Sequence, residues 1–210
     1  MSAPVWPQVM VTGHRPHHLP VGAPASVRGE LDRIAVKLRD GHGMTAGITG
    51  MALGADLLWA ASLHRAQVSY IAHIPFPEQP DPWRRNNPHA VTEWERLRGL
   101  ADREVVYGTL AGLAERARKG AAVKLLHRRN DGMLAAVVSA RGAVVAVWCP
   151  SKLNGGTHSA LQKAHRLGLP VIHINPEART TTVPSRARLS HLLHPTAPDE
   201  LPPTATGDTR

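Results

Sequence analysis

The sequence predicts an α/β protein with a Rossmann-like fold, in which a mainly parallel sheet of about six strands has helices on both faces. Two observations lead to this class. Short apolar runs alternate along the chain with segments whose apolar residues recur at helical spacing. Of all residues, 42% are hydrophobic but only 4% are aromatic, which fits alanine, valine and leucine side chains packed between helices and a sheet.

The expected elements alternate in a regular order. Segment 26–40 carries its apolar residues on one helical face, and Ser26 is its predicted N-cap. Segment 110–140 predicts one long helix or two shorter ones, broken near Gly120 and residues 130–132. The expected strands are 9–12, 46–49, 68–74, 104–107, 143–149 and 171–174, and the expected helices are 26–40, 57–63, 92–102, 110–140 and 157–167.

The chain is long enough for one well-buried domain. We place this Rossmann-like domain at residues 1–176. Residues 177–210 are rich in Thr, Pro, Ser and Arg, and we expect them to form an irregular, flexible tail. Within this tail only Leu189, Leu192 and Leu193 suggest a short helix.

A strand, a glycine-rich loop and a helix in succession predict an anion site in segment 143–161. Gly155 and Gly156 have no Cβ and let the backbone approach a ligand closely. Thr157 is the predicted N-cap of the following helix, whose free N–H groups would face a phosphate or carboxylate. The alternative is that Gly-Gly-Thr only turns the chain and starts a helix. Both interpretations stay open at this point.

The net charge of +9 indicates an anionic partner. The whole excess lies in residues 1–176, which carry 21 bases and 12 acids, since the tail is neutral. Six bases fall between Arg116 and Arg129 with no acid among them. Such a run is typical of a solvated helix face, a nucleic-acid contact or the rim of a phosphate pocket.

Compartment and metal content also follow from the sequence. The single Cys149 excludes an internal disulfide, and neither a signal peptide nor a membrane-spanning apolar run is visible. We therefore expect a soluble, cytoplasmic protein without a membrane partner. Histidines 14, 17 and 18 are close in sequence, but they lie in a proline-bearing loop with no Cys or acid beside them. We expect no metal and no cofactor.

Five motifs occur in order along residues 9–176. They are Val11–Pro16 (VTGHRP), Ile48–Asp56 (ITGMALGAD), Ile74-Pro75-Phe76 with Gln79 and Trp83, Arg129-Asn130 with Met133, and Gly155-Gly156-Thr157. With these motifs the sequence resembles the SLOG superfamily, which is named for the DNA-processing DprA proteins and the Lonely Guy phosphoribohydrolases, and specifically its YspA/YpsA-like branch. The resemblance implies a Rossmann-like fold that binds nucleotides or nucleotide-derived molecules at the carboxyl ends of the strands.

The loops after the first, second and penultimate expected strands should therefore line one crevice. Arg129 would offer a guanidinium fork to phosphate, and Asp56 would accept from ribose hydroxyls or cap its own helix. For Arg15 and Arg129 the alternative is a surface salt bridge. The expected ligand-binding residues are Gly13, His14, Arg15, Gly50, Met51, Gly54, Ala55, Asp56, Arg129, Asn130, Gly155, Gly156 and Thr157.

The resemblance leaves three functions to weigh. We expect a module that senses or sequesters a nucleotide-derived molecule, either NAD- or ADP-ribose-like or a nucleoside phosphate. The first alternative is a Lonely Guy-like hydrolase of the N-glycosidic bond, with Arg129 and Asp56 as its catalytic candidates. Ala160 stands where the Lonely Guy motif has its acid, which disfavours catalysis. The second alternative is DprA-like binding of single-stranded DNA, and by analogy we expect a homodimer.

Overall fold

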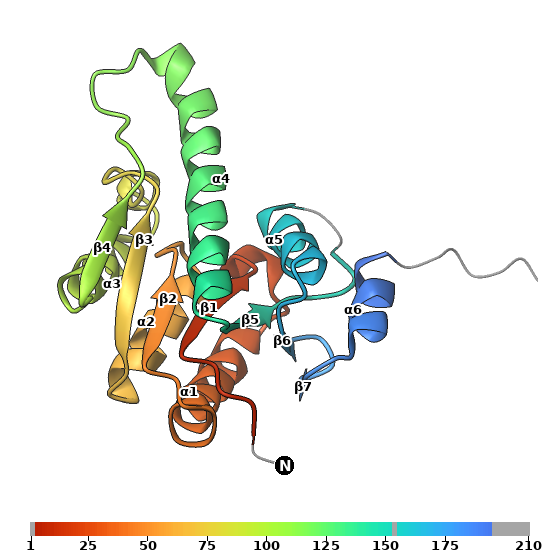
Figure 1. Cartoon of the computed structure of the whole chain (residues 1–210). Coiled ribbons are helices and arrows are strands. Elements are labelled where there is room, and N and C mark those ends of the chain that lie inside the picture. Colours follow the sequence, from red (N-terminus) through yellow and green to blue (C-terminus); the bar gives the residue numbers. More distant parts are fainter. Residues whose placement is uncertain (1–2, 153–154, 195–210) are drawn as a thin grey trace, which may run out of the picture.

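A computed structural model describes residues 3–152 and 155–194 and confirms the predicted fold class (Figure 1). Its strands are β1 (Gln8–Gly13), β2 (Ala46–Thr49), β3 (Ser69–Ile74), β4 (Arg103–Val106), β5 (Ala143–Val147), β6 (Val171–Asn175) and β7 (Thr180–Thr182). They form one sheet in the order β4-β3-β2-β1-β5-β6-β7. Strands β1 to β6 are parallel to one another, and β7 pairs antiparallel with β6.

Helices cover both faces of this sheet. They are α1 (Ala23–His42), α2 (Ala55–Arg65), α3 (Pro88–Gly99), α4 (Glu115–Ser139), α5 (Gly155–Arg166) and α6 (Arg186–Leu193), with short 3-10 turns at Pro16–His18 and Asp81–Trp83. The helices α1, α2 and α3 pack on one face, and α4, α5 and α6 pack on the other. No helix in the described ranges is long and apolar enough to cross a membrane.

Two buried clusters hold the layers together, and alternating residues of the central strands divide between them. Val9 and Val11 of β1 face the cluster of α1, α2 and α3, whereas Met10 points to the cluster of α4, α5 and α6. Strand β5 is buried at every position. Burial on both faces explains why such strands appear in the sequence as unbroken apolar runs.

The strand order creates a switch point between β1 and β5. From β1 the chain adds β2, β3 and β4 on one side, and α4 then returns it to the other side of β1, where β5 and β6 follow. The loops that leave β1 and β5 therefore run toward opposite faces of the sheet. In open α/β sheets a crevice for ligands lies at this place, outside the carboxyl ends of the strands.

Of the two alternatives for segment 110–140, one long helix is confirmed, since α4 runs unbroken through Gly120 and residues 130–132. Three local predictions were wrong. Helix α1 begins at Ala23, and Ser26 donates to the Ala23 carbonyl within the helix instead of capping it. Helix α5 begins at Gly155, so that Thr157 lies inside it and is not its N-cap.

The third correction concerns the segment after Pro176, which was expected to be irregular apart from a short helix suggested by Leu189, Leu192 and Leu193. Its described part adds β7 to the sheet as a seventh strand and packs α6 against α5. Two histidines of α5 fix this packing, since His158 bonds to the Leu193 carbonyl and His165 to that of Arg186, each at 3.1 Å. Residues 153–154 of the predicted glycine-rich loop and residues 195–210 of the predicted tail lie outside the described residues.

Candidate functional site

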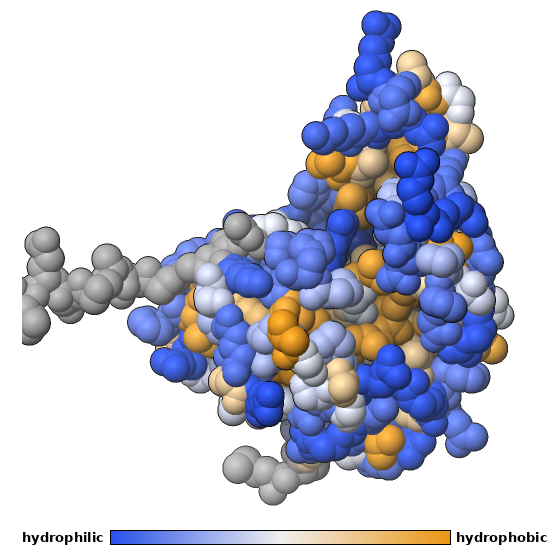
Figure 2. Space-filling view, turned by 180° about the vertical axis from the view of Figure 1, so that it is seen from behind, coloured by the Kyte–Doolittle hydropathy of each residue, from blue (hydrophilic) through white to orange (hydrophobic). Residues whose placement is uncertain are grey.

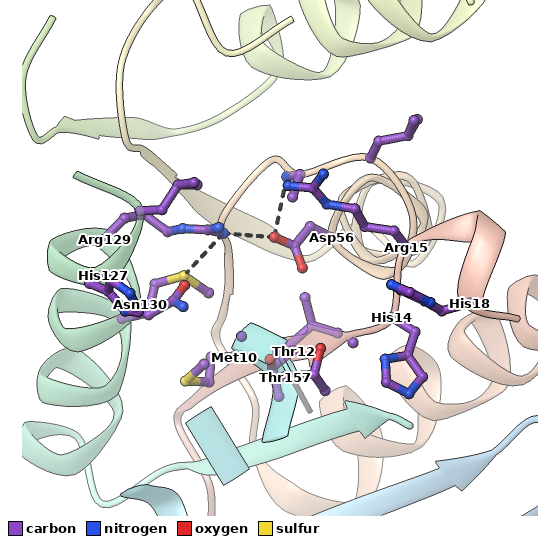
Figure 3. A pocket seen from close by; sticks show the side chains of 18 of the residues that line it. Met10, Thr12, His14, Arg15, His18, Asp56, His127, Arg129, Asn130 and Thr157 are labelled. Atoms are coloured by element: carbon purple, nitrogen blue, oxygen red, sulfur yellow. Dashed lines mark hydrogen bonds and ion pairs between the residues drawn. The ribbon is translucent and has the colours of Figure 1, made fainter. Parts of the chain in front are cut away.

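A cavity of about 350 Å³ lies at the carboxyl end of β1, at the switch point of the sheet (Figure 3). Its walls come from the loop after β1, the loop after β2, the middle of α4 and the first turn of α5. Nine of the thirteen expected ligand-binding residues line it. They are Gly13, His14, Arg15, Asp56, Arg129, Asn130, Gly155, Gly156 and Thr157.

The other four expected residues, Gly50, Met51, Gly54 and Ala55, do not line the cavity and instead shape the loop behind its wall. A Cβ on Gly50 would lie 1.3 Å from Nη1 of Arg129, so the absence of a side chain there makes room for the guanidinium. Gly54 has a φ of +112°, and a Cβ there would lie 2.7 Å from the His14 carbonyl oxygen. Met51 and Ala55 are buried in the core.

A buried ion pair joins the first turn of α2 to α4. Nη1 of Arg129 donates to Oδ2 of Asp56 at 2.8 Å, and both side chains are only 8% exposed. The same carboxylate oxygen accepts from the Ala52 N–H at 3.2 Å, and Nη1 of Arg129 lies 4.0 Å from Sδ of Met133. Burial raises the pKa of Asp56, and the Arg129 charge opposes this shift.

This pair excludes one of the two sequence-based alternatives for each residue. Arg129 is not part of a surface salt bridge, because its partner is a buried carboxylate. Asp56 does not cap α2, since its side chain accepts from Ala52, upstream of the helix. It is also the single carboxylate among the described lining residues. The cavity therefore presents little negative charge of its own.

Basic side chains border the cavity on the β1 side. Arg15 is exposed, has no ion-pair partner in the described part of the chain, and extends over the crevice (Figure 3). His17 and His18 follow it in the short turn. Desolvation and the positive charges of His17, Lys152 and Arg15 lower the pKa of His18. The uncharged His18 imidazole is therefore favoured at neutral pH.

His14 forms part of the wall and is 4% exposed. Burial lowers its pKa, and a hydrogen bond with the Cys149 backbone opposes this shift. Its Nε2 atom is inaccessible and has no hydrogen-bond partner among the described residues. His14 is thus a buried wall residue and does not present Nε2 to the cavity.

The first turn of α5 lines the cavity, and the first N–H groups of an α-helix have no acceptor within the helix itself. Gly155 has a φ of +83°, a conformation that favours glycine, and the turn contains no acidic residue. Around Gly156 the space is open, since the nearest atom to a Cβ there would be Nδ2 of Asn130 at 3.9 Å. The positive end of the helix dipole and these amides make this turn suitable for an anion.

Five apolar residues, which were not among the expected ligand-binding residues, also line the cavity, and we name them the apolar wall. It consists of Met10, Leu53, Val123, Leu126 and Met133. The three α4 residues share one helical face with Asn130, and this spacing could have revealed them. The remaining lining residues that were missed are Val11, Thr12, His17, His18, Ala52 and His127.

Behind the ion pair lies a second buried polar group outside the cavity. Nδ1 of His73 is 2.8 Å from the Tyr107 hydroxyl, and the Gln79 amide donates to the Gly50 carbonyl at 3.3 Å. Desolvation and the charge of Arg129 lower the pKa of His73 to about 4. Within the described ranges, no group of three His, Cys, Asp or Glu side chains is arranged to hold a metal ion.

No protein-family model matches the chain, and no curated protein matches it in sequence. Among solved structures, DNA processing protein A (DprA) from Streptococcus pneumoniae matches 90% of this chain with a TM-score of 0.54 and 16% identity. The match covers 55% of that DprA, so this chain spans about half of its length. DprA from Helicobacter pylori has a TM-score of 0.49 and 18% identity, with 81% of this chain and 65% of that chain covered.

A Moco carrier protein from Chlamydomonas reinhardtii is 18% identical with a TM-score of 0.43, and the match covers 82% of this chain and 80% of that one. At these identities the likeness to the Streptococcus pneumoniae DprA shows a shared fold. This shared fold agrees with the predicted Rossmann-like class, while membership of the SLOG superfamily and of its YspA/YpsA-like branch stays a prediction.

Proposed function

We propose that this protein binds a nucleotide-derived small molecule in the cavity at the switch point and acts as a sensor or sequestering module. The observation that carries the proposal is the meeting of three chain segments, the loops after β1 and β2 and the first turn of α5, around one cavity of about 350 Å³. Pockets for small ligands typically combine such a volume with a few convergent polar groups.

The two sides of the cavity fit the two chemical parts of a nucleotide. The first turn of α5 and Arg15 would bind phosphate through backbone N–H groups and a guanidinium. The apolar wall with Leu53, Val123 and Leu126 would cover the face of a base, and the Asn130 amide can donate to or accept from its edge. This division supports a nucleoside phosphate or an ADP-ribose-like molecule.

Binding without cleavage is part of the proposal. Breaking an N-glycosidic bond develops positive charge on the ribose, which a carboxylate would stabilise. Ala160 at the position of the Lonely Guy acid is 3% exposed, and the Asp56 carboxylate is engaged by Arg129 and Ala52. Prolonged incubation with AMP followed by chromatography should therefore yield no free base. Release of adenine would contradict this part of the proposal.

Calorimetric titration with AMP, ADP, ADP-ribose and NAD tests the binding itself. Gly156→Asp places a carboxylate in open space at the start of α5, where it suits the helix dipole but repels a bound phosphate. The matched control is Gly29→Asp on the exposed face of α1, where a Cβ also meets nothing within 4 Å. We expect at least one ligand to bind the wild type and Gly29→Asp but not Gly156→Asp.

Absence of heat from every ligand, or equal binding to both variants, would contradict the proposal.

The homodimer and the cytoplasmic location also remain predictions. Light scattering of the full chain tests the first of these.

A further inference from the structure

The N-terminal half of α4 projects from the body of the molecule (Figure 1, Figure 2). Within its first six residues, Glu115–Gly120, only Arg118 is half-buried and the others are exposed. One turn later Leu125 packs against Phe76 and Leu110, and this small cluster anchors the projection. The exposed start of α4 therefore lacks a partner in the described part of the chain.

Five cations lie on this half of α4, and we name Arg116, Arg118, Lys119, Lys124 and Arg128 the cationic arm. None of them has an ion-pair partner among the described residues, and Glu115 is the one acid between 115 and 128. Several arginines elsewhere, among them Arg33, Arg65 and Arg96, are paired with carboxylates. The arm thus concentrates uncompensated positive charge.

The positive charge of the arm favours a polyanion as its binding partner. A second copy of this chain is disfavoured, because two positively charged arms repel each other. Single strands are generally bound with aromatic side chains that stack on bases, and no Phe, Trp or Tyr occurs between Gly108 and Val147. Phosphates held on a duplex backbone need no such stacking.

The diameter of the helical arm favours duplex DNA over duplex RNA as its partner. An α-helix is about 10–12 Å across, and the major groove of B-form DNA is about 12 Å wide, whereas the major groove of A-form RNA is too narrow to be read by side chains. Successive helical residues are about 100° apart, so that Arg116, Arg118 and Lys119 project in different directions around the tip. Cations in this arrangement can reach the phosphates on both walls of a groove.

We propose that the cationic arm binds double-stranded DNA through its phosphate backbone, independently of base sequence. This surface is separate from the anion-binding turn of α5, since none of its five residues lines the cavity. Contacts to about four phosphates predict that the affinity falls about 100-fold when the salt concentration rises from about 50 to about 200 mM.

Fluorescence anisotropy of the full chain with labelled DNA tests this proposal. The probes are a duplex of about two helical turns, one of its strands alone, and an RNA duplex of the same sequence. We expect tighter binding to duplex DNA than to either other probe. We also expect the triple variant Arg116→Gln, Arg118→Gln and Lys119→Gln to lose at least about tenfold in affinity and to have a shallower salt dependence.

The matched control removes the same charge elsewhere, through Arg166→Gln, Arg186→Gln and Arg188→Gln on the exposed surface of α5 and α6. It should bind DNA like the wild type, and thermal melting verifies that both variants are folded. Equal losses in the two triple variants would show that only net charge matters and would overturn the proposal. Preference for the single strand or the RNA duplex, or absence of DNA binding, would also overturn it.

Discussion

Nη1 of Arg129 on α4 lies 2.8 Å from Oδ2 of Asp56 on α2, and this buried contact joins two segments 73 residues apart. It has two effects on the candidate site. The contact fixes the α4 wall against the loop after β2, and it compensates the charge of the one carboxylate among the described lining residues. The account of an anion-binding cavity depends on both effects.

Removing one partner of this pair should destabilise the protein strongly. Asp56→Asn leaves the Arg129 charge buried without compensation, and we expect a loss of about 3–5 kcal/mol in the free energy of unfolding. Glu93→Gln, which breaks the exposed Arg96–Glu93 pair, should cost less than about 1 kcal/mol. Urea unfolding measures both changes. A loss of similar small size in the two variants would show that the Asp56–Arg129 pair does not stabilise the fold.

Gly50→Ala should displace Arg129, because the new Cβ would lie 1.3 Å from Nη1. We expect a loss of at least about 2 kcal/mol in the free energy of unfolding, from the broken pair and the shifted α4 wall. Gly29→Ala on exposed α1 is the control, and it should stabilise the helix by up to about 1 kcal/mol. If Gly50→Ala unfolds at the same urea concentration as the wild type, the guanidinium of Arg129 does not pack closely against Gly50.

Acid should weaken the fold through His73. The pKa of His73 is lowered from 6.5 to about 4 in the folded protein, so the contribution of the neutral imidazole is complete above pH 6.5. This contribution is lost as the pH falls through about 4, and its size is about 3 kcal/mol. Urea unfolding between pH 7 and pH 4 should show a shallower pH dependence for His73→Asn than for the wild type.

Tyr107→Phe serves as the control for this pH effect. It removes the hydroxyl partner of His73 but keeps the imidazole buried, so it should retain the slope of the wild type. An unchanged slope in His73→Asn would assign the acid sensitivity to other groups.

Ligand binding should strengthen in mild acid because of His18. Desolvation and neighbouring positive charges lower its pKa, and a bound anion would favour the protonated form. We expect the affinity for ADP-ribose, whose diphosphate keeps its charge in this range, to rise about threefold or more as the pH falls from about 7.5 to about 5.5. His18→Gln should reduce this rise, while His89→Gln on exposed α3 should leave it unchanged. Equal pH dependence in the two variants would exclude His18 as the titrating group.

The inner strands could be predicted because burial on both faces leaves unbroken apolar runs in the sequence, and most helices could be predicted because their apolar residues recur at helical spacing. The unbroken course of helix α4 was harder to predict, because it contains Gly120 and Gly132 and glycine usually weakens a helix. Gly132 is needed there for packing, as a Cβ would lie 1.7 Å from the Tyr107 hydroxyl oxygen. Strand β7 contains only three threonines, and its pairing with β6 decides its conformation.

Nine of the twenty residues that line the cavity were predicted, from motifs found in the sequence. The sequence has no local signal for the Asp56–Arg129 pair, because the two residues meet only through the packing of α4 on the sheet. The apolar wall was not predicted, because Val123 and Leu126 belong to no motif, although they share a helical face with Asn130.

A crystal structure of the protein with AMP or ADP-ribose tests the central claim most directly. The account predicts the phosphate within about 3 Å of backbone N–H groups in the first turn of α5, with the base against Leu53, Val123 and Leu126. A nucleotide bound elsewhere, or a cavity without ligand at saturating concentration, would contradict it.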